Sequence, residues 1–160
     1  MNARHFTALA ITTSLLAFSA QIAQAADGPL AHFAGNWSGN GKITVQNGTS
    51  ERIRCRSSNS ASGNGLNLSM RCASDSYTFN LGSEITADGS NVSGSWNETS
   101  RGVVGSLSGK ISGSNITATA TSVGVTAALS IKTSGNALSV SIRSPGSEVS
   151  EVSVTMARGR

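Results

Sequence analysis

The sequence predicts an all-β protein, an antiparallel up-and-down meander barrel of about 8–10 strands that carries one disulfide. Three observations lead to this prediction. Apolar and polar residues alternate in segment after segment, short turn-forming strings separate the segments, and the chain holds two cysteines. A period of two places the apolar side chains on one face of each strand. Short turns make neighbouring strands antiparallel, and a meander that curls shut pairs its first strand with its last.

Residues 1–25 predict a cleavable signal peptide. Arg4 gives a basic start, residues 6–20 form a largely apolar run without charge, and Ala23 and Ala25 are small residues of the kind that signal peptidase accepts. The run is interrupted by Thr and Ser and is shorter than the ~20 residues that cross a bilayer. We therefore expect export to the periplasm or the extracellular space, with no membrane-spanning segment after cleavage.

The rest of the chain divides into an N-terminal lead-in segment, residues 26–35, and a β-barrel domain, residues 36–160. Without Arg4, 11 of the 12 Lys and Arg remain against 8 Asp and Glu, so the net charge is +3. This mildly basic balance does not require nucleic acid as a partner, because non-specific affinity grows with each phosphate that is neutralised. The length is typical of one domain with a modest core.

The alternating segments of the barrel domain follow one another at short intervals, with small polar residues between their apolar members. In chain order the apolar members are Ile43 and Val45; Ile53 and Cys55; Leu66, Leu68, Met70 and Cys72; Tyr77, Phe79 and Leu81; Val92, Gly94 and Trp96; Val103, Gly105 and Leu107; Ile116, Ala118 and Ala120; Val125, Ala127, Leu129 and Ile131; Leu138, Val140 and Ile142; Val152, Val154 and Met156. The strings between them are rich in Gly and Asn, such as Asn47-Gly48 and Asp88-Gly89, which supply the positive φ that tight hairpins need.

Cys55 and Cys72 are expected to form the disulfide. Two cysteines in an exported protein, without Cys or His partners nearby, favour a cross-link over a metal site. If the two cysteines stand opposite each other, every pair of that antiparallel ladder sums to 127. The other pairs are then Ser57 with Met70, Asn59 with Leu68 and Ala61 with Leu66.

Residues 33–37, with the sequence FAGNW, resemble the opening motif of the lipocalin and calycin families. The resemblance implies that Trp37 plugs the closed end of the barrel and that Gly35 lets the entering backbone pass close by. It also implies an Arg from a late strand packed over the tryptophan, for which Arg143 and Arg158 are both candidates. Trp37 would equally be a core residue without the resemblance.

The chain after residue 25 also resembles a recurring type of small exported bacterial protein with no established activity. This resemblance bears only on the fold and on the cellular location. The strings that carry this resemblance are FAGNWSG (33–39), ERIRCR (51–56), RCASDSY (71–77), SGSW (93–96) and SIR (141–143). Avidin-type barrels are similar in plan, but their biotin sites use several tryptophans. This barrel domain has only Trp37 and Trp96, so biotin binding is not expected, and Trp96 has no special position in the scheme.

A third resemblance is to small periplasmic inhibitors of metalloproteases, which combine a Gly-x-Trp barrel with one disulfide. It implies an N-terminal tail that enters the protease cleft, and residues 26–30 are short enough to be such a tail. Residues 29–32 just before the first strand could form a helical turn.

Arg52, Arg54 and Arg56 alternate with apolar residues, so they project together from the outer face of one strand, and Arg71 has the parity to join them. One interpretation is a basic patch for an anionic partner such as lipopolysaccharide, phospholipid headgroups or nucleic acid. The other, which the pattern favours, is a solvated sheet face that resists edge-to-edge aggregation. No aromatic residue is interleaved for base stacking, so nucleic acid is the less favoured partner.

Nothing in the sequence selects a catalytic site, a metal site or a cofactor, so we do not expect an enzyme. His32 is the one histidine after the signal peptide, and the carboxylates are scattered. The expected function is binding of a small apolar ligand or of an envelope partner. The alternatives are a structural or interaction protein of the envelope with a filled core, or a protease inhibitor. A cavity of several hundred Å³ inside the barrel would distinguish the first from the second.

Overall fold

The computed structural model describes residues 28–159. The predicted signal peptide and the first two residues of the lead-in segment lie outside the described residues. Within them, no helix is long and apolar enough to span a bilayer.

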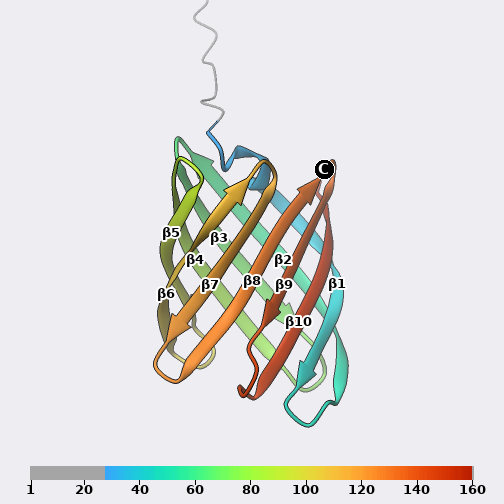
Figure 1. The fold of residues 1–160 in the computed structure, drawn as a ribbon. Coiled ribbons are helices and arrows are strands. Elements are labelled where there is room, and N and C mark those ends of the chain that lie inside the picture. Colours follow the sequence, from blue (N-terminus) through green and yellow to red (C-terminus); the bar gives the residue numbers. More distant parts are fainter. Residues whose placement is uncertain (1–27, 160) are drawn as a thin grey trace, which may run out of the picture.

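Ten antiparallel strands form one closed barrel in meander order, as the sequence predicts (Figure 1). A 3-10 turn, η1 (Ala31–Phe33), precedes them, in agreement with the predicted helical turn. The strands are β1 (Gly35–Val45), β2 (Ser50–Ser62), β3 (Gly65–Ala73), β4 (Thr78–Asp88), β5 (Asn91–Glu98), β6 (Val103–Ser112), β7 (Asn115–Ser122), β8 (Val125–Ser134), β9 (Ala137–Arg143) and β10 (Val149–Arg158). Each strand pairs with its neighbours in sequence, and β1 pairs with β10 to close the sheet.

The predicted disulfide between Cys55 and Cys72 is present. The two cysteines stand opposite each other in the β2–β3 ladder, and the same register pairs Ser57 with Met70. Both cysteines are buried on the inner face of the barrel. A disulfide of this kind is typical of proteins that reside in an oxidising compartment outside the cytoplasm.

Burial inside the barrel differs between its two ends. Near the end that holds η1, inward-facing side chains such as Leu66, Ile116 and Leu138 are almost completely buried. Nearer the opposite end, Leu129 and Ile142 also face inward but are only half-buried. The barrel is therefore packed solid at one end, which we call the closed end, and is hollow toward the other, which we call the mouth.

Trp37 lies at the closed end with Phe33 and Leu30, and all three side chains are buried. The indole Nε1 of Trp37 donates a hydrogen bond to the carbonyl oxygen of Phe33 at 3.2 Å, which satisfies the one polar group of the ring. The segment that enters the barrel is thereby tied to the residue that plugs it. Trp37 is thus buried beside the segment that leads into the first strand.

Arg158, not Arg143, packs on this tryptophan. The guanidinium carbon of Arg158 lies 4.1 Å from the centroid of the Trp37 ring, a cation–π contact. Arg158 also donates hydrogen bonds to the carbonyl oxygens of Ala34 and His32. Arg143 instead pairs with Glu151 at the mouth, with 3.6 Å between Nε and Oε1.

Gly35 and Asn59 complete the closed end. Gly35 has φ +128°, and a Cβ at this position would collide with the guanidinium of Arg158, so only glycine fits. Asn59 is buried and donates from Nδ2 to the carbonyl oxygen of Phe33 at 3.0 Å. Its Oδ1 accepts a hydrogen bond from the hydroxyl of Ser57 at 2.6 Å. The buried polar groups of this end are thus paired, as stability requires.

The two tryptophans allow an internal comparison of the closed end with the hollow end. We expect Trp37→Ala to lower the free energy of unfolding by about 3–5 kcal/mol, as large core truncations do. Trp96→Ala should cost less, because the indole of Trp96 borders a cavity that already exists. Urea unfolding followed by circular dichroism measures both. In the Trp96→Ala protein, quenching of the remaining Trp37 by acrylamide as efficiently as free indole would contradict its burial.

Candidate functional site

A cavity of about 320 Å³ occupies the hollow part of the barrel. It runs from the middle of the barrel to the mouth, where the β5–β6 and β9–β10 turns lie, at the end opposite η1 (Figure 1). Its walls are aliphatic and aromatic, and they include Leu68, Met70, Phe79, Leu107, Leu129 and Ile142. The volume falls at the lower end of the range found for small-molecule sites.

Small inward-facing side chains create this space. Ala120 of β7 and Ala127 of β8 stand opposite each other in the ladder, and both line the cavity. Gly82 and Ser83 of β4 line it from another wall. The diameter of a barrel grows with its number of strands, so the interior of this ten-strand barrel is too wide for these small side chains to fill. Of the two outcomes that small inward residues allow, a tight barrel or a cavity, the structure has the cavity.

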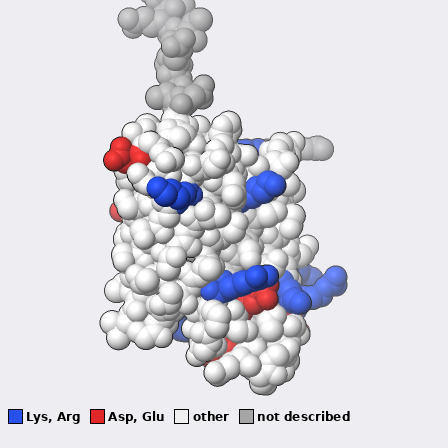
Figure 2. Space-filling view, in the orientation of Figure 1, with Lys and Arg blue, Asp and Glu red and all other residues white. Residues whose placement is uncertain are grey.

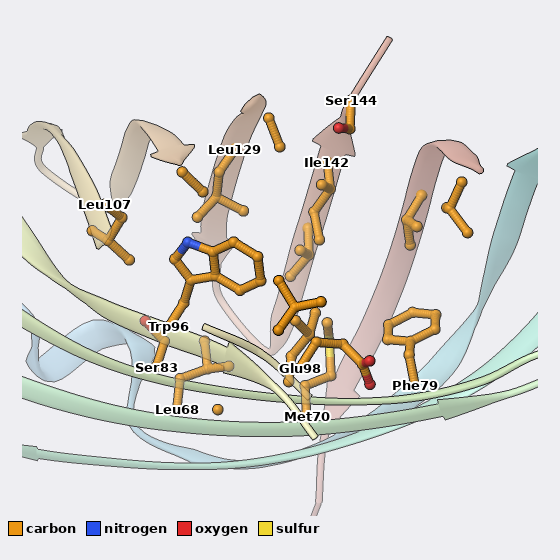
Figure 3. A pocket seen from close by; sticks show the side chains of 18 of the residues that line it. Leu68, Met70, Phe79, Ser83, Trp96, Glu98, Leu107, Leu129, Ile142 and Ser144 are labelled. Atoms are coloured by element: carbon orange, nitrogen blue, oxygen red, sulfur yellow. The ribbon is translucent and has the colours of Figure 1, made fainter. Parts of the chain in front are cut away.

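Trp96 projects from β5 into the cavity, beneath Leu129 and Ile142 in Figure 3. Its neighbours across the two flanking ladders are Ser83 and Gly105, both too small to displace the ring. A Cβ on Gly105 would lie 2.6 Å from the indole Nε1, so the ring depends on this glycine. Nε1 donates to the carbonyl oxygen of Ser106 at 3.2 Å. The one polar atom of the indole is thus hydrogen-bonded to the barrel backbone, and the rest of the ring presents apolar surface to the cavity.

Glu98 follows Trp96 on the same face of β5 and reaches the mouth, although it is only 8% exposed. Its Oε1 accepts hydrogen bonds from the backbone N–H groups of Asn80 at 2.8 Å and Ser100 at 3.0 Å. Its Oε2 accepts from the N–H of Arg101 at 2.8 Å. Burial raises the pKa of Glu98, but these bonds outweigh burial and hold the pKa below its usual value. Glu98 is therefore an ionised anchor of the β5–β6 turn.

Arg101 spans the mouth between two turns. Its guanidinium lies 3.7 Å from Oε2 of Glu98 and 3.9 Å from Oε2 of Glu148, which belongs to the β9–β10 turn. The side chains of Arg101 and Glu148 are 38% and 68% exposed. Ion pairs this exposed contribute at most about 1 kcal/mol. The contact across the mouth can therefore open at little cost.

The residues singled out in the sequence lie elsewhere. Gly35 and Trp37 form the closed end, Cys55 and Cys72 cross-link one wall, and Arg52, Arg54, Arg56 and Arg71 are exposed on the outside. None of them lines the cavity. From the sequence, Trp96 had no special position and Glu98 was grouped with the scattered carboxylates, whereas both residues line the cavity. A sequence signal for Glu98 was present. The inward series of Val92, Gly94 and Trp96 reaches Glu98 at its next position.

The cavity presents mainly apolar surface. Among residues 28–159, no group of three or more His, Cys, Asp and Glu side chains is placed to hold a metal ion. The carboxylate of Glu98 is occupied by backbone N–H groups. His32 lies in η1 at the closed end, away from the cavity. That the protein is not an enzyme stays a prediction.

Replacement of Glu98 by Gln tests its role as an anchor. Gln keeps the shape but removes the charge, and hydrogen bonds to a charged acceptor are worth about 1.5–3 kcal/mol each. We expect Glu98→Gln to unfold at lower urea concentration at pH 7. Since the folded-state pKa of Glu98 is below the unfolded one, its stabilisation is present above the unfolded pKa and disappears as the pH falls through the folded pKa. The free energies of unfolding of the two proteins should therefore converge at strongly acidic pH. A difference that does not change with pH would argue against the anchoring role of the ionised carboxylate.

Comparison with known proteins adds to the description of the fold. No protein-family model and no curated protein matches the chain. Among solved structures, the crystal structure of Rv2717c from M. tuberculosis is similar, with a TM-score of 0.64 and 14% sequence identity over 82% of this chain and 95% of that one. At this identity the likeness shows the fold alone. The chain is thus a closed ten-strand barrel with a distant structural neighbour.

Proposed function

We propose that this protein is an exported carrier that binds a small apolar ligand inside its barrel. The observation that carries the proposal is the apolar cavity of about 320 Å³, open at the mouth and sealed at the closed end. In a barrel with a filled core, Leu81, Leu129 and Ile142 would be fully buried, and here they are half-buried. This supports a binding protein over a structural protein. Export and the lipocalin-like character belong to the proposal.

The chemistry of the lining indicates the class of ligand. Its body is apolar, because the walls away from the mouth are apolar and the N–H of Trp96 is already bonded. Its polar end, at the mouth, is neutral. Glu98 and Glu148 against Arg101 leave a net charge of −1 among the charged side chains that line the mouth, so an anionic end would be repelled.

Protease inhibition is less well supported. Leu30, the last residue of the candidate tail, is completely buried at the closed end. The N–H of Ala31 bonds the carbonyl oxygen of Gly28, which folds this part of the segment back on itself. A tail that enters a protease cleft would have to consist of the few residues before Leu30.

A neutral fluorescent probe, N-phenyl-1-naphthylamine, tests the proposal by titration. We expect saturable binding with energy transfer from Trp96 to the probe. Ala127→Phe places a ring in the cavity and should weaken probe binding at least tenfold. The matched control is Ala128→Phe on the same strand, because Ala128 is exposed on the outside of the barrel.

Equal binding by the Ala127→Phe and Ala128→Phe proteins would contradict an internal site. Circular dichroism checks that both variants fold. Should Ala127→Phe fail to do so, Ala120→Leu fills the same space from β7 with a smaller side chain.

A further inference from the structure

Five cationic side chains stand together on the outer face of β1, β2 and β3, and none of them lines the cavity or contributes to the closed end. They are Lys42, Arg52, Arg54, Arg56 and Arg71, which we call the basic face. All five are exposed. Within residues 28–159, the ion pairs involve Arg101 and Arg143 and no member of the basic face.

The strand register brings like charges directly opposite each other. Lys42 pairs with Arg52 across the β1–β2 ladder, and Arg56 pairs with Arg71 across the β2–β3 ladder. Cβ atoms of such pairs are roughly 4.5–5.5 Å apart, and like charges at this spacing are destabilising. Arg54 lies between the two pairs on the same face of β2. The protein alone gains nothing from this arrangement, whereas an anionic partner would remove the repulsion.

The residues directly opposite the basic face in the strand ladders carry no charge. The direct cross-strand partners outside the basic face are Ser153 for Lys42, Asn40 and Ala73 for Arg54, Ser38 for Arg56 and Asn80 for Arg71. These side chains are uncharged, and their hydroxyl and amide groups suit phosphate oxygens. None of these neighbours is aromatic, so the face lacks the platform on which nucleic-acid bases stack.

The position of the face on the barrel favours one kind of anionic partner. Lys42, Arg52 and Arg71 each lie within four residues of the mouth end of their strand. On the face formed by β6–β9, by contrast, charged side chains are few and separated (Figure 2). A cluster of four or more exposed cations on one side of a protein is typical of surfaces that bind anionic lipid headgroups.

We propose that the basic face binds the surface of an anionic lipid bilayer. The contact is electrostatic, with lipid phosphates placed between the paired cations. The inference goes beyond ligand binding and does not depend on it, since the basic face is on the outside of the barrel and the cavity is inside.

Sedimentation with lipid vesicles tests the proposal on the protein without added ligand. Vesicles of phosphatidylglycerol and phosphatidylcholine should bind the protein at low ionic strength and release it as salt is added. Vesicles of phosphatidylcholine alone should not bind it. The test variant is Arg52→Gln with Arg71→Gln, which breaks both like-charge pairs. At about 1 kcal/mol per cation, it should bind roughly 30-fold more weakly.

The matched control is Lys110→Gln with Lys132→Gln, which removes the same charge from exposed positions on β6 and β8. It should bind within threefold of the parent protein. The test variant should also melt at a temperature no lower than the parent, because like-charge repulsion is removed.

Three results would overturn the proposal: no binding to the anionic vesicles, equal loss in test and control variants, or tighter binding to a single-stranded oligonucleotide than to the vesicles. Failure of the fluorescent-probe experiment would leave this result unaffected, so the two proposals stand or fall separately.

Discussion

The ladder between β1 and β10 is the contact on which the rest of the structure depends, because it turns an open sheet into a barrel without edges. Trp37 and Arg158 are direct partners in this ladder, so their cation–π contact stabilises both the β1–β10 pairing, which we call the seam, and the closed end. Gly39 and Gly41 face inward along the same seam, where a Cβ would collide with the β10 backbone. Without these glycines β10 could not approach closely enough to pair.

The distribution of side-chain size along the strands divides the barrel into two parts with different roles. Large apolar residues fill the closed end and provide stability through burial. Alanine, glycine and serine near the mouth leave a space that the protein does not fill. A cavity weakens a fold, since its walls lose packing partners. The disulfide, the paired polar groups around Asn59 and the anchored Glu98 offset that loss at the margins of the hollow region.

The fold could be predicted from the sequence because period-two alternation and turn residues act locally. The Cys55–Cys72 register followed from simple pairing along one hairpin. The sequence could not tell whether Arg158 or Arg143 packs on Trp37, because this depends on which strand end meets Trp37 when the barrel closes. The cavity was not predictable either, since its volume depends on the strand number and tilt as well as on side chains. β4 extends beyond its predicted apolar members, which ended at Leu81, because the next inward position holds the polar Ser83 and hides the continuation of the pattern.

Asn59 shows a second limit of pattern reading. Its parity placed it inside, but its partner is a backbone carbonyl of η1, 26 residues earlier in the chain. No local rule identifies such a partner. Trp96 was visible as an inward residue, yet its importance depends on the empty space beside it, which only the assembled barrel defines.

The described chain both begins and ends at the closed end, since Gly28 precedes η1 there and β10 finishes beside it (Figure 1). The mouth therefore points away from both points where the barrel could be joined to something else. A dye, an affinity tag or a solid support attached beside either of these residues would leave access to the interior open. The same geometry makes the barrel a convenient module for display, because its cavity faces outward from any surface that holds it by its ends.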